Sequence, residues 1–423
     1  VYDAARLVVS ALSLLLGLLV WHWARRLHGA RGALLALAAY AFSPETIAHA
    51  GLVGMDLATA LGFTASLYAF WRFVRGGAWG WWTLTALALG LSLLTRFSTA
   101  QLAPAFVLLA LLGAMSGRPR APGRMWLGLA LLPLTSLLIL NAGYLFQTSL
   151  APLSNWHFRS DSFQHLAKAW PGLRLPVPDA CLAGFDYISS LQTEGALRTF
   201  LLGKVTEHSH WYYMPFALLI KWPLGFLGLL AARAGFDAWL ELPRARGPIA
   251  RARHAWHERF LLIPVGVMLV VAMFFAHLDV GVRYLLPIVP LLCIWIGGLI
   301  PPPARVAATR GIALRRWRML ALAFALLMAV ETLSAAPYEL SFFNRVAGRH
   351  PDRLINDSNV DWGQGLIALR DELRRRGIAR VHLVYHGTTD PALYGITYES
   401  YLGGVPSPDI DWLAVSSYYL MGL

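Results

Sequence analysis

Ten separate stretches of predominantly apolar residues recur along this chain, and each approaches the roughly 20 residues that a helix needs to cross a bilayer. Only 14% of the 423 residues are charged, and two cysteines, Cys181 and Cys293, are too few for a disulfide scaffold. The composition also excludes a disordered chain and a coiled coil. We therefore predict an all-α polytopic membrane protein with about ten transmembrane helices. The stretches lie at 6–23, 32–48, 56–75, 79–95, 98–115, 125–146, 211–232, 259–277, 284–300 and 319–336.

Arginines gather in every second connection between these stretches, whereas the intervening connections are nearly balanced in charge. The formal net charge is +13, but the basic residues form short runs between apolar stretches. We interpret them as markers of cytoplasmic loops and predict no nucleic-acid partner. This pattern places the N-terminus and everything after residue 336 on the outer face. The basic runs lie at 25–31, 72–75, 118–124, 233–259 and 305–318.

The beginning of the chain does not fit this orientation by itself. The sequence opens with Val1 and carries no signal peptide. An outer N-terminus without an export signal implies an earlier transmembrane helix, so we expect the chain to be a fragment or a processed form of a longer protein.

The tail, 337–423, is more polar and has a different periodicity. Strands are predicted at 353–357, 381–385 and 412–416, and an amphipathic helix at 363–376. Strand, helix and strand in this order indicate a βαβ unit, which predicts a small α/β domain on the outer face. The predicted domains are 1–336, a transmembrane domain, and 337–423, an α/β domain that we expect to be incomplete.

The long outer loop, 148–210, contains four histidines, but no spacing among them matches a standard metal-ligand motif. We therefore predict no metal site in this loop. The histidines are His157, His165, His208 and His210.

Asp56 is the first candidate for chemistry, since it follows the outer turn between the second and third stretches, close to His49. One interpretation is structural, because aspartate is favoured as a helix N-cap and near the positive end of the helix dipole. The other is functional, with a carboxylate at the membrane surface that orients an acceptor hydroxyl or helps to hold a metal. The two interpretations are compatible.

Lys221 lies ten residues into a predicted span, or about 15 Å along the helix. That depth is too great for easy snorkelling to the outer face, and Pro223 frees a backbone carbonyl beside it. Lys221 is either a snorkelled or paired structural charge, or a cation that faces a polar cavity and receives an anionic headgroup.

Arg283 and Tyr284 open the ninth stretch at the outer face, where arginine runs against the orientation rule. Pairing with Asp279 at i,i+4 would account for Arg283 structurally. The alternative is that its guanidinium binds a phosphate. Arg96, in another outer turn, is a weaker candidate of the same kind.

Five blocks of this sequence together resemble the family 39, polyprenol-phosphate-dependent glycosyltransferases, which are C-type membrane enzymes. This family is related to protein O-mannosyltransferases and to the lipid A aminoarabinose transferase. The resemblance extends over nearly the whole chain in the right order. The blocks are Ser43-Pro44 with His49 and Asp56, Tyr212-Tyr213 with Lys221-Trp222-Pro223, Gly281–Pro287, Pro337–Asn344 and Asp357–Gln364.

The resemblance implies transfer of a sugar from a polyprenyl-phosphate donor to an acceptor hydroxyl of a protein, lipid or glycan, with inversion. It implies a bacterial inner membrane protein with a periplasmic C-terminal domain and the lipid bilayer as its environment. The expected catalytic residues are Asp56 and His49, and the expected donor phosphate-binding residues are Lys221, Arg283, Tyr284 and Arg96. The family's main catalytic carboxylate lies in a first outer loop, which we expect to precede this chain. Some relatives use a divalent metal, and the sequence fixes no metal ligand here.

Two alternatives from other classes stay open at this stage. A transporter or flippase for lipid-linked sugars would use the same cations, although internal repeats, which are typical of transporters, are absent from the sequence. A non-catalytic assembly subunit is the third interpretation.

Overall fold

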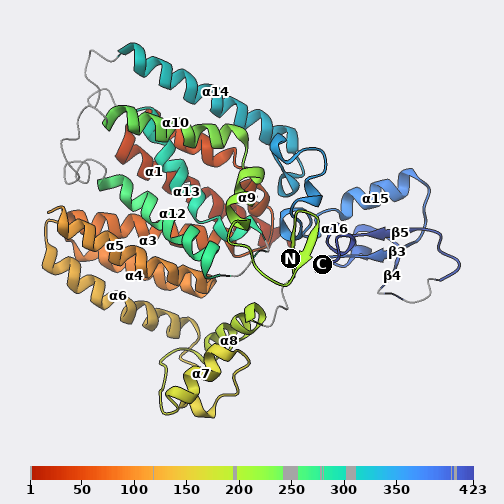
Figure 1. Ribbon diagram of the computed structural model, residues 1–423, viewed down its shortest axis with the longest axis horizontal. Helices are drawn as coiled ribbons and strands as arrows, with labels where there is room; N and C mark the ends of the chain where they lie inside the picture. The colour runs from red at the N-terminus through yellow and green to blue at the C-terminus, as the bar shows by residue number, and fades with distance from the viewer. Residues whose placement is uncertain are drawn as a thin grey trace.

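The computed structural model describes residues 2–117, 119–193, 198–241, 256–276, 279, 281–301, 311–401, 403 and 407–423. The basic residues at 244–253 and 305–310, together with Arg118, lie outside the described residues. The chain forms a bundle of long helices, with a small α/β unit beside one end of it (Figure 1). The helices of the bundle are α1 (Tyr2–Ala41), α2 (Pro44–Ala50), α3 (Asp56–Gly76), α4 (Trp79–Thr95), α5 (Leu102–Met115), α6 (Pro122–Gly143), α9 (Tyr213–Lys221), α10 (Leu224–Glu241), α12 (Trp256–Phe274), α13 (Ile288–Ile296) and α14 (Gly311–Ala335).

The helix α1 is a hairpin of two arms, which matches the first two predicted stretches. Gly29 interrupts it with φ 79° and ψ −178°. The hydroxyl of Ser13 lies 3.0 Å from that of Tyr40, whereas 27 residues of straight helix would separate them by about 40 Å. The arms therefore fold back on each other, and Gly17 packs against the ring of Tyr40.

The bundle carries the surface of a multi-pass membrane protein. Of the described helices, six are long and apolar enough to cross a membrane, or seven if the bent pair of α9 and α10 counts as one span. Large apolar side chains cover the outside of α14, where Leu326 and Leu333 are 67% and 65% exposed. A soluble protein rarely exposes such a continuous apolar face.

The expected number of ten spans is not confirmed. The predicted span at 211–232 is broken into α9 and α10, which meet at an angle of 110°. Pro223 lies in the break, where its ring prevents a continuous helix. The predicted span at 284–300 contains only α13 and short 3-10 turns.

The polar tail forms the predicted α/β unit, with a core of its own. Its three-stranded parallel sheet has the order β4, β3, β5, and an amphipathic helix precedes β3. Leu366, Leu373, Val381 and Ile396 form a separate small core, whereas Ile355 joins the large core of the bundle. The boundary at 336 stays a prediction. The elements are α15 (Leu366–Arg375), β3 (Val381–Val384), β4 (Tyr398–Ser400), β5 (Leu413–Val415) and α16 (Ser417–Leu420).

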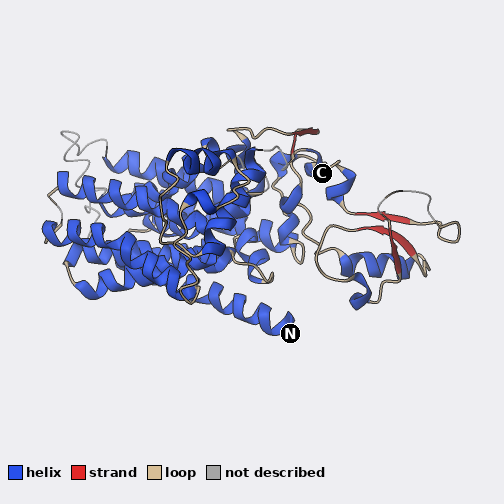
Figure 2. Cartoon of the chain, turned by 90° about the horizontal axis from the view of Figure 1, so that it is seen from below, coloured by secondary structure: helices blue, strands red, loops and turns tan. Residues whose placement is uncertain are grey.

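The strand predicted at 353–357 is wrong. Short 3-10 turns flank Ile355, which makes a single bridge to Leu201. Asp357 has φ 61°, which a strand cannot accommodate. Figure 2 shows the sheet set apart from the helical bundle.

The long loop between α6 and α9 contains two helices and a hairpin. Cys181 lies in this loop and is free and buried. Cys293, in α13, is also free and buried. The elements are α7 (Asp161–Ala169), α8 (Asp179–Thr193), β1 (Thr199–Leu201) and β2 (Lys204–Thr206), and the two strands pair antiparallel.

Candidate active site

A cavity of about 570 Å³ opens between the end of the helical bundle and the α/β unit. From the bundle, His49, Asp56, Arg96 and Arg283 line it. Four of the six predicted site residues therefore line the same cavity. They come from α2, α3, the α4–α5 turn and the segment before α13. The opposite wall comes from the tail, and Trp362 lies on that side.

Asp56 is the buried carboxylate of this cavity, and it is 7% exposed. It is the first residue of α3, while Met55 occupies the N-cap position without a side-chain hydrogen bond, so the N-cap interpretation of Asp56 is wrong. The Oδ1 atom of Asp56 instead accepts a hydrogen bond from Arg96. Because Asp56 lies in the first turn of α3, its negative charge still interacts favourably with the helix dipole.

His49 presents one ring nitrogen to Asp56 and uses the other to hold its own helix. The Nδ1 atom lies 2.8 Å from the carbonyl oxygen of Glu45. A carbonyl only accepts, so Nδ1 carries a proton and donates a hydrogen bond to Glu45. The Nε2 atom lies 4.0 Å from Oδ2 of Asp56.

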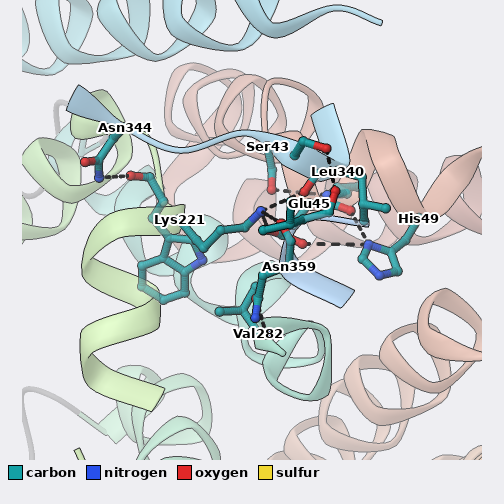
Figure 3. A network of polar contacts seen from close by, with 12 residues as sticks. Ser43, Glu45, His49, Lys221, Val282, Leu340, Asn344 and Asn359 are labelled. Atoms are coloured by element: carbon teal, nitrogen blue, oxygen red, sulfur yellow. Dashed lines mark hydrogen bonds and ion pairs between the residues drawn. The ribbon is translucent and has the colours of Figure 1, made fainter. Parts of the chain in front are cut away.

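Lys221 does not reach the cavity. Its side chain is completely buried, and its ammonium donates to the carbonyl oxygens of Leu340 at 2.7 Å and Asn359 at 2.8 Å. Oε1 of Glu45 lies 3.3 Å from Nζ (Figure 3). A charge buried this deeply requires such partners, and this geometry is that of a paired structural charge. Lys221 thus lies behind the cavity wall, where its ammonium contacts the lining residue Leu340 through the backbone carbonyl. Glu45 connects it to the helix that carries His49.

Two arginines share the ring of Tyr284 at the cavity edge. The guanidinium carbon of Arg96 lies 4.3 Å from the ring centroid, and that of Arg283 lies 5.2 Å from it. Arg283 also lies 4.1 Å from the centroid of Trp362, across the boundary to the tail. Its Nε is buried without a hydrogen-bond partner among the described residues. Aromatic faces therefore fix both guanidinium groups while leaving donors for a ligand.

Asp279 has a hydrogen-bond partner other than Arg283, the residue with which the i,i+4 interpretation pairs it. Its Oδ2 accepts a hydrogen bond of 2.7 Å from the backbone N–H of His210. The turn between Asp279 and Arg283 passes Gly281, whose φ is 149°. A Cβ there would lie 2.3 Å from Oγ of Ser358, so only glycine fits.

Asp357 lies close to this cluster with a strained backbone, at φ 61°. Burial raises the pKa of its carboxyl, and the N–H of Ser358 and the charges of Arg283 and His386 oppose this effect only in part. Residues with a strained backbone of this kind gather at functional sites.

The comparisons with known proteins identify the N-terminal part of the chain. Residues 2–140 match the family model of the dolichyl-phosphate-mannose-protein mannosyltransferases. Over these residues the chain is similar to this mannosyltransferase family. The matched residues include His49, Asp56 and Arg96, which line the bundle side of the cavity.

Solved structures of a bacterial membrane protein are also similar. ArnT from Cupriavidus metallidurans bound to undecaprenyl phosphate is 17% identical, with a TM-score of 0.43, over 80% of this chain and 58% of ArnT. The apo structure of ArnT is 18% identical, with a TM-score of 0.45, over 88% of this chain and 56% of ArnT. The chain thus spans less than two thirds of the length of these structures. No curated protein matches it.

The cavity wall and the contacts behind it include residues that the sequence analysis did not single out. Glu45 carries a signal that was available, because a glutamate between apolar stretches is costly unless it is paired. Arg6, near the start of α1, adds a third arginine to the lining. Trp362 and His386 lie far along the chain, and only the docking of the tail shows their place.

The residues around Asp56 do not form a divalent-metal site. Oδ1 of Asp56 is bound to Arg96, and the described part of the chain contains no group of three His, Cys, Asp or Glu side chains placed to hold an ion. Divalent ions prefer several oxygen ligands, so these side chains alone do not fit one.

Proposed function

We propose that this chain transfers a sugar from a polyprenyl-phosphate donor to an acceptor hydroxyl, at a cavity that faces the periplasm of a bacterial cell. The observation that carries the proposal is the cavity itself. One buried carboxylate, Asp56, stands there among Arg96 and Arg283, at the end of apolar helices. A lipid-linked phosphate enters such a site with its tail in the bilayer and its headgroup among cations.

Arg283 is the donor phosphate-binding residue in this proposal. Its guanidinium is held by aromatic rings, and its buried Nε has no partner in the described residues. Arginine binds phosphate oxygens through parallel hydrogen bonds, and it stabilises the charge that builds on a departing phosphate. Arg96 adds a second positive charge beside the same Tyr284 ring.

Asp56 is the general base in this proposal. Arg96 occupies Oδ1, which leaves Oδ2 facing His49 and the cavity. The acceptor oxygen bonds to the anomeric carbon as the bond from that carbon to the phosphate oxygen breaks. The acceptor proton passes to Asp56, and the polyprenyl phosphate leaves with the bonding electrons. Attack from the face opposite the phosphate inverts the anomeric carbon.

A reconstituted assay tests this function. The protein in liposomes receives polyprenyl-phosphate sugars with a radiolabelled sugar, together with peptide, lipid and glycan acceptors. We expect covalent label on an acceptor hydroxyl, and we expect Arg283→Gln to raise the donor KM by at least tenfold. Label that only crosses the bilayer, in a lipid-linked form, contradicts transfer and supports a transporter.

A further inference from the structure

The tail side of the cavity is built from the turn that follows the central strand of the sheet. Residues 385–389 come directly after β3, and Tyr385, His386, Thr388 and Thr389 all line the cavity. Ligands of open parallel sheets bind outside the carboxyl ends of the strands. The turn lies at that end of β3, and it faces the arginines of the bundle.

The turn is held in a fixed shape. The hydroxyl of Tyr385 donates to the carbonyl of Gly363 at 3.2 Å, and the N–H of His386 donates to Oγ of Ser416 at 3.2 Å. The ring of His386 stacks on Tyr418, with centroids 3.9 Å apart and planes at 10°. Groups that bind ligands selectively need this kind of support.

Gly387 adds a further constraint on this turn. A Cβ at this position would lie 2.2 Å from the hydroxyl oxygen of Tyr385. Any side chain here would displace Tyr385 and with it the turn. Thr388 and Thr389 follow Gly387 directly, and both line the cavity.

The two walls of the cavity differ in chemistry. The bundle wall combines charged residues with the apolar Leu52, Val53 and Met55. The tail wall is lined by residues that carry hydroxyl, imidazole and aromatic groups, namely Thr388, Thr389, His386, Trp362 and Tyr419. Trp362 and Tyr419 are 39% and 41% exposed, so part of each ring is open. Hydroxyl groups both donate and accept, and aromatic rings pack against C–H groups. A ring that carries several hydroxyls and apolar C–H faces matches this wall.

We propose that the turn 385–389, together with Trp362, is a sugar-recognition subsite that binds a pyranose or furanose ring beside the phosphate held by Arg283. This inference rests on the proposed function and names the part of the substrate that the α/β unit recognises. The ring belongs either to the donor sugar or to a glycan acceptor. Thr388 and Thr389 act as specificity-determining residues, since each hydroxyl position of the ring needs a partner on the protein.

The test compares two lipids on the full chain in lipid nanodiscs. One is polyprenyl phosphate, and the other is the same lipid carrying the sugar that the wild-type protein transfers. The double variant Thr388→Val/Thr389→Val removes both hydroxyls with little change in size. Thr397→Val, an exposed threonine in the same α/β unit that does not line the cavity, is the matched control.

We expect the double variant to bind polyprenyl phosphate with the affinity of the wild type. The factor by which the attached sugar increases affinity should be at least tenfold smaller in the double variant than in the wild type. An unchanged donor affinity with an acceptor KM raised at least tenfold assigns the ring to the acceptor instead. The proposal is overturned if the double variant matches Thr397→Val in both measurements.

Failure of the proposed function has a different signature. In that case the wild type neither binds polyprenyl phosphate nor transfers a sugar. The subsite is then tested directly by saturation-transfer NMR with methyl glycosides of common hexoses. Signals that the double variant abolishes support the subsite, and signals that it retains, or their absence from the wild type, overturn it.

Discussion

Glu45 and Lys221 form a buried ion pair, with Oε1 and Nζ 3.3 Å apart, directly behind the histidine that faces Asp56. Glu45 precedes His49 by one helical turn, and its carbonyl holds Nδ1 of that ring. The pair therefore fixes α2, the helix that presents His49 to the cavity. This relationship connects a charge inside the bundle to the proposed chemistry without direct contact with a substrate.

The first prediction concerns this pair. Lys221→Met leaves the carboxylate of Glu45 buried without its cation, and removal of one partner of a buried pair costs about 3–5 kcal/mol. We expect a marked fall in Tm in detergent. The double variant Lys221→Met/Glu45→Gln removes both charges and is expected to recover most of that loss.

A double variant no more stable than Lys221→Met would contradict this structural role. The single variant is also expected to leave the donor KM of any folded fraction within about threefold of the wild type, because Lys221 does not line the cavity. A large rise in donor KM, with unchanged Tm, would instead support Lys221 as a phosphate-binding residue.

The second prediction concerns Asp56. Asp56→Asn keeps the shape of the side chain but removes its ability to take a proton, and loss of a general base typically costs about 10²–10⁴ in rate. We expect kcat to fall by that range while donor affinity changes little. Asp371→Asn, at an exposed carboxylate on α15, is the control and should leave kcat unchanged. A kcat for Asp56→Asn within threefold of the control would exclude Asp56 as the base.

The third prediction concerns Gly281, which sets the path of the chain into Arg283. Gly281→Ala places a Cβ 2.3 Å from Oγ of Ser358 and forces alanine into φ 149°. We expect a lower Tm and a raised donor KM, because Arg283 shifts with its turn. Gly266→Ala, in α12, has open space at the same position and should not lower Tm. If both variants behave alike, the strain at Gly281 has no consequence for the site.

Much of the bundle side of the site could be predicted from the sequence. The alternation of apolar stretches and basic connections places the turns with His49, Asp56, Arg96 and Arg283 at one end of the helices, and the structure brings these four residues together. The depth of a residue along a helix follows from its position in the sequence, as it does for Lys221. The direction of a side chain around the helix depends on its neighbours, so the pairing of Lys221 with Glu45 could not be predicted.

The tail side could be predicted only in outline. Hydrophobic periodicity predicts α15, β3 and β5, because each buries one face within the α/β unit. The docking of Trp362 on Arg283 joins residues far apart in sequence, and no local pattern encodes it. The strand expected at 353–357 fails for a local reason, since Asn356 and Asp357 hold the backbone in a turn through side-chain hydrogen bonds.

The last prediction concerns pH and the loop that carries α7 and α8. Burial alone would raise the pKa of Asp186, but hydrogen bonds from the N–H groups of Arg159 and Ser160 and from the Ser160 hydroxyl outweigh it and lower the pKa. A carboxyl whose pKa is lower when folded stabilises the loop above its unfolded pKa, about 3.9. That stability is lost as the pH falls through the folded pKa. After correction for the intrinsic pH dependence of amide exchange, we expect faster hydrogen exchange at the amides of Arg159 and Ser160 below about pH 4.

Asp186→Asn should show the fast exchange already at pH 7, because a neutral amide oxygen is a weaker acceptor for these three donors; hydrogen bonds to charged groups contribute about 1.5–3 kcal/mol. Asp161→Asn, in α7, lies outside this set of hydrogen bonds and serves as the control. Exchange that is slow in Asp186→Asn, or equally fast in both variants, would show that Asp186 does not order the loop. The cavity side of the protein should be unaffected in either variant, since Asp186 does not line it.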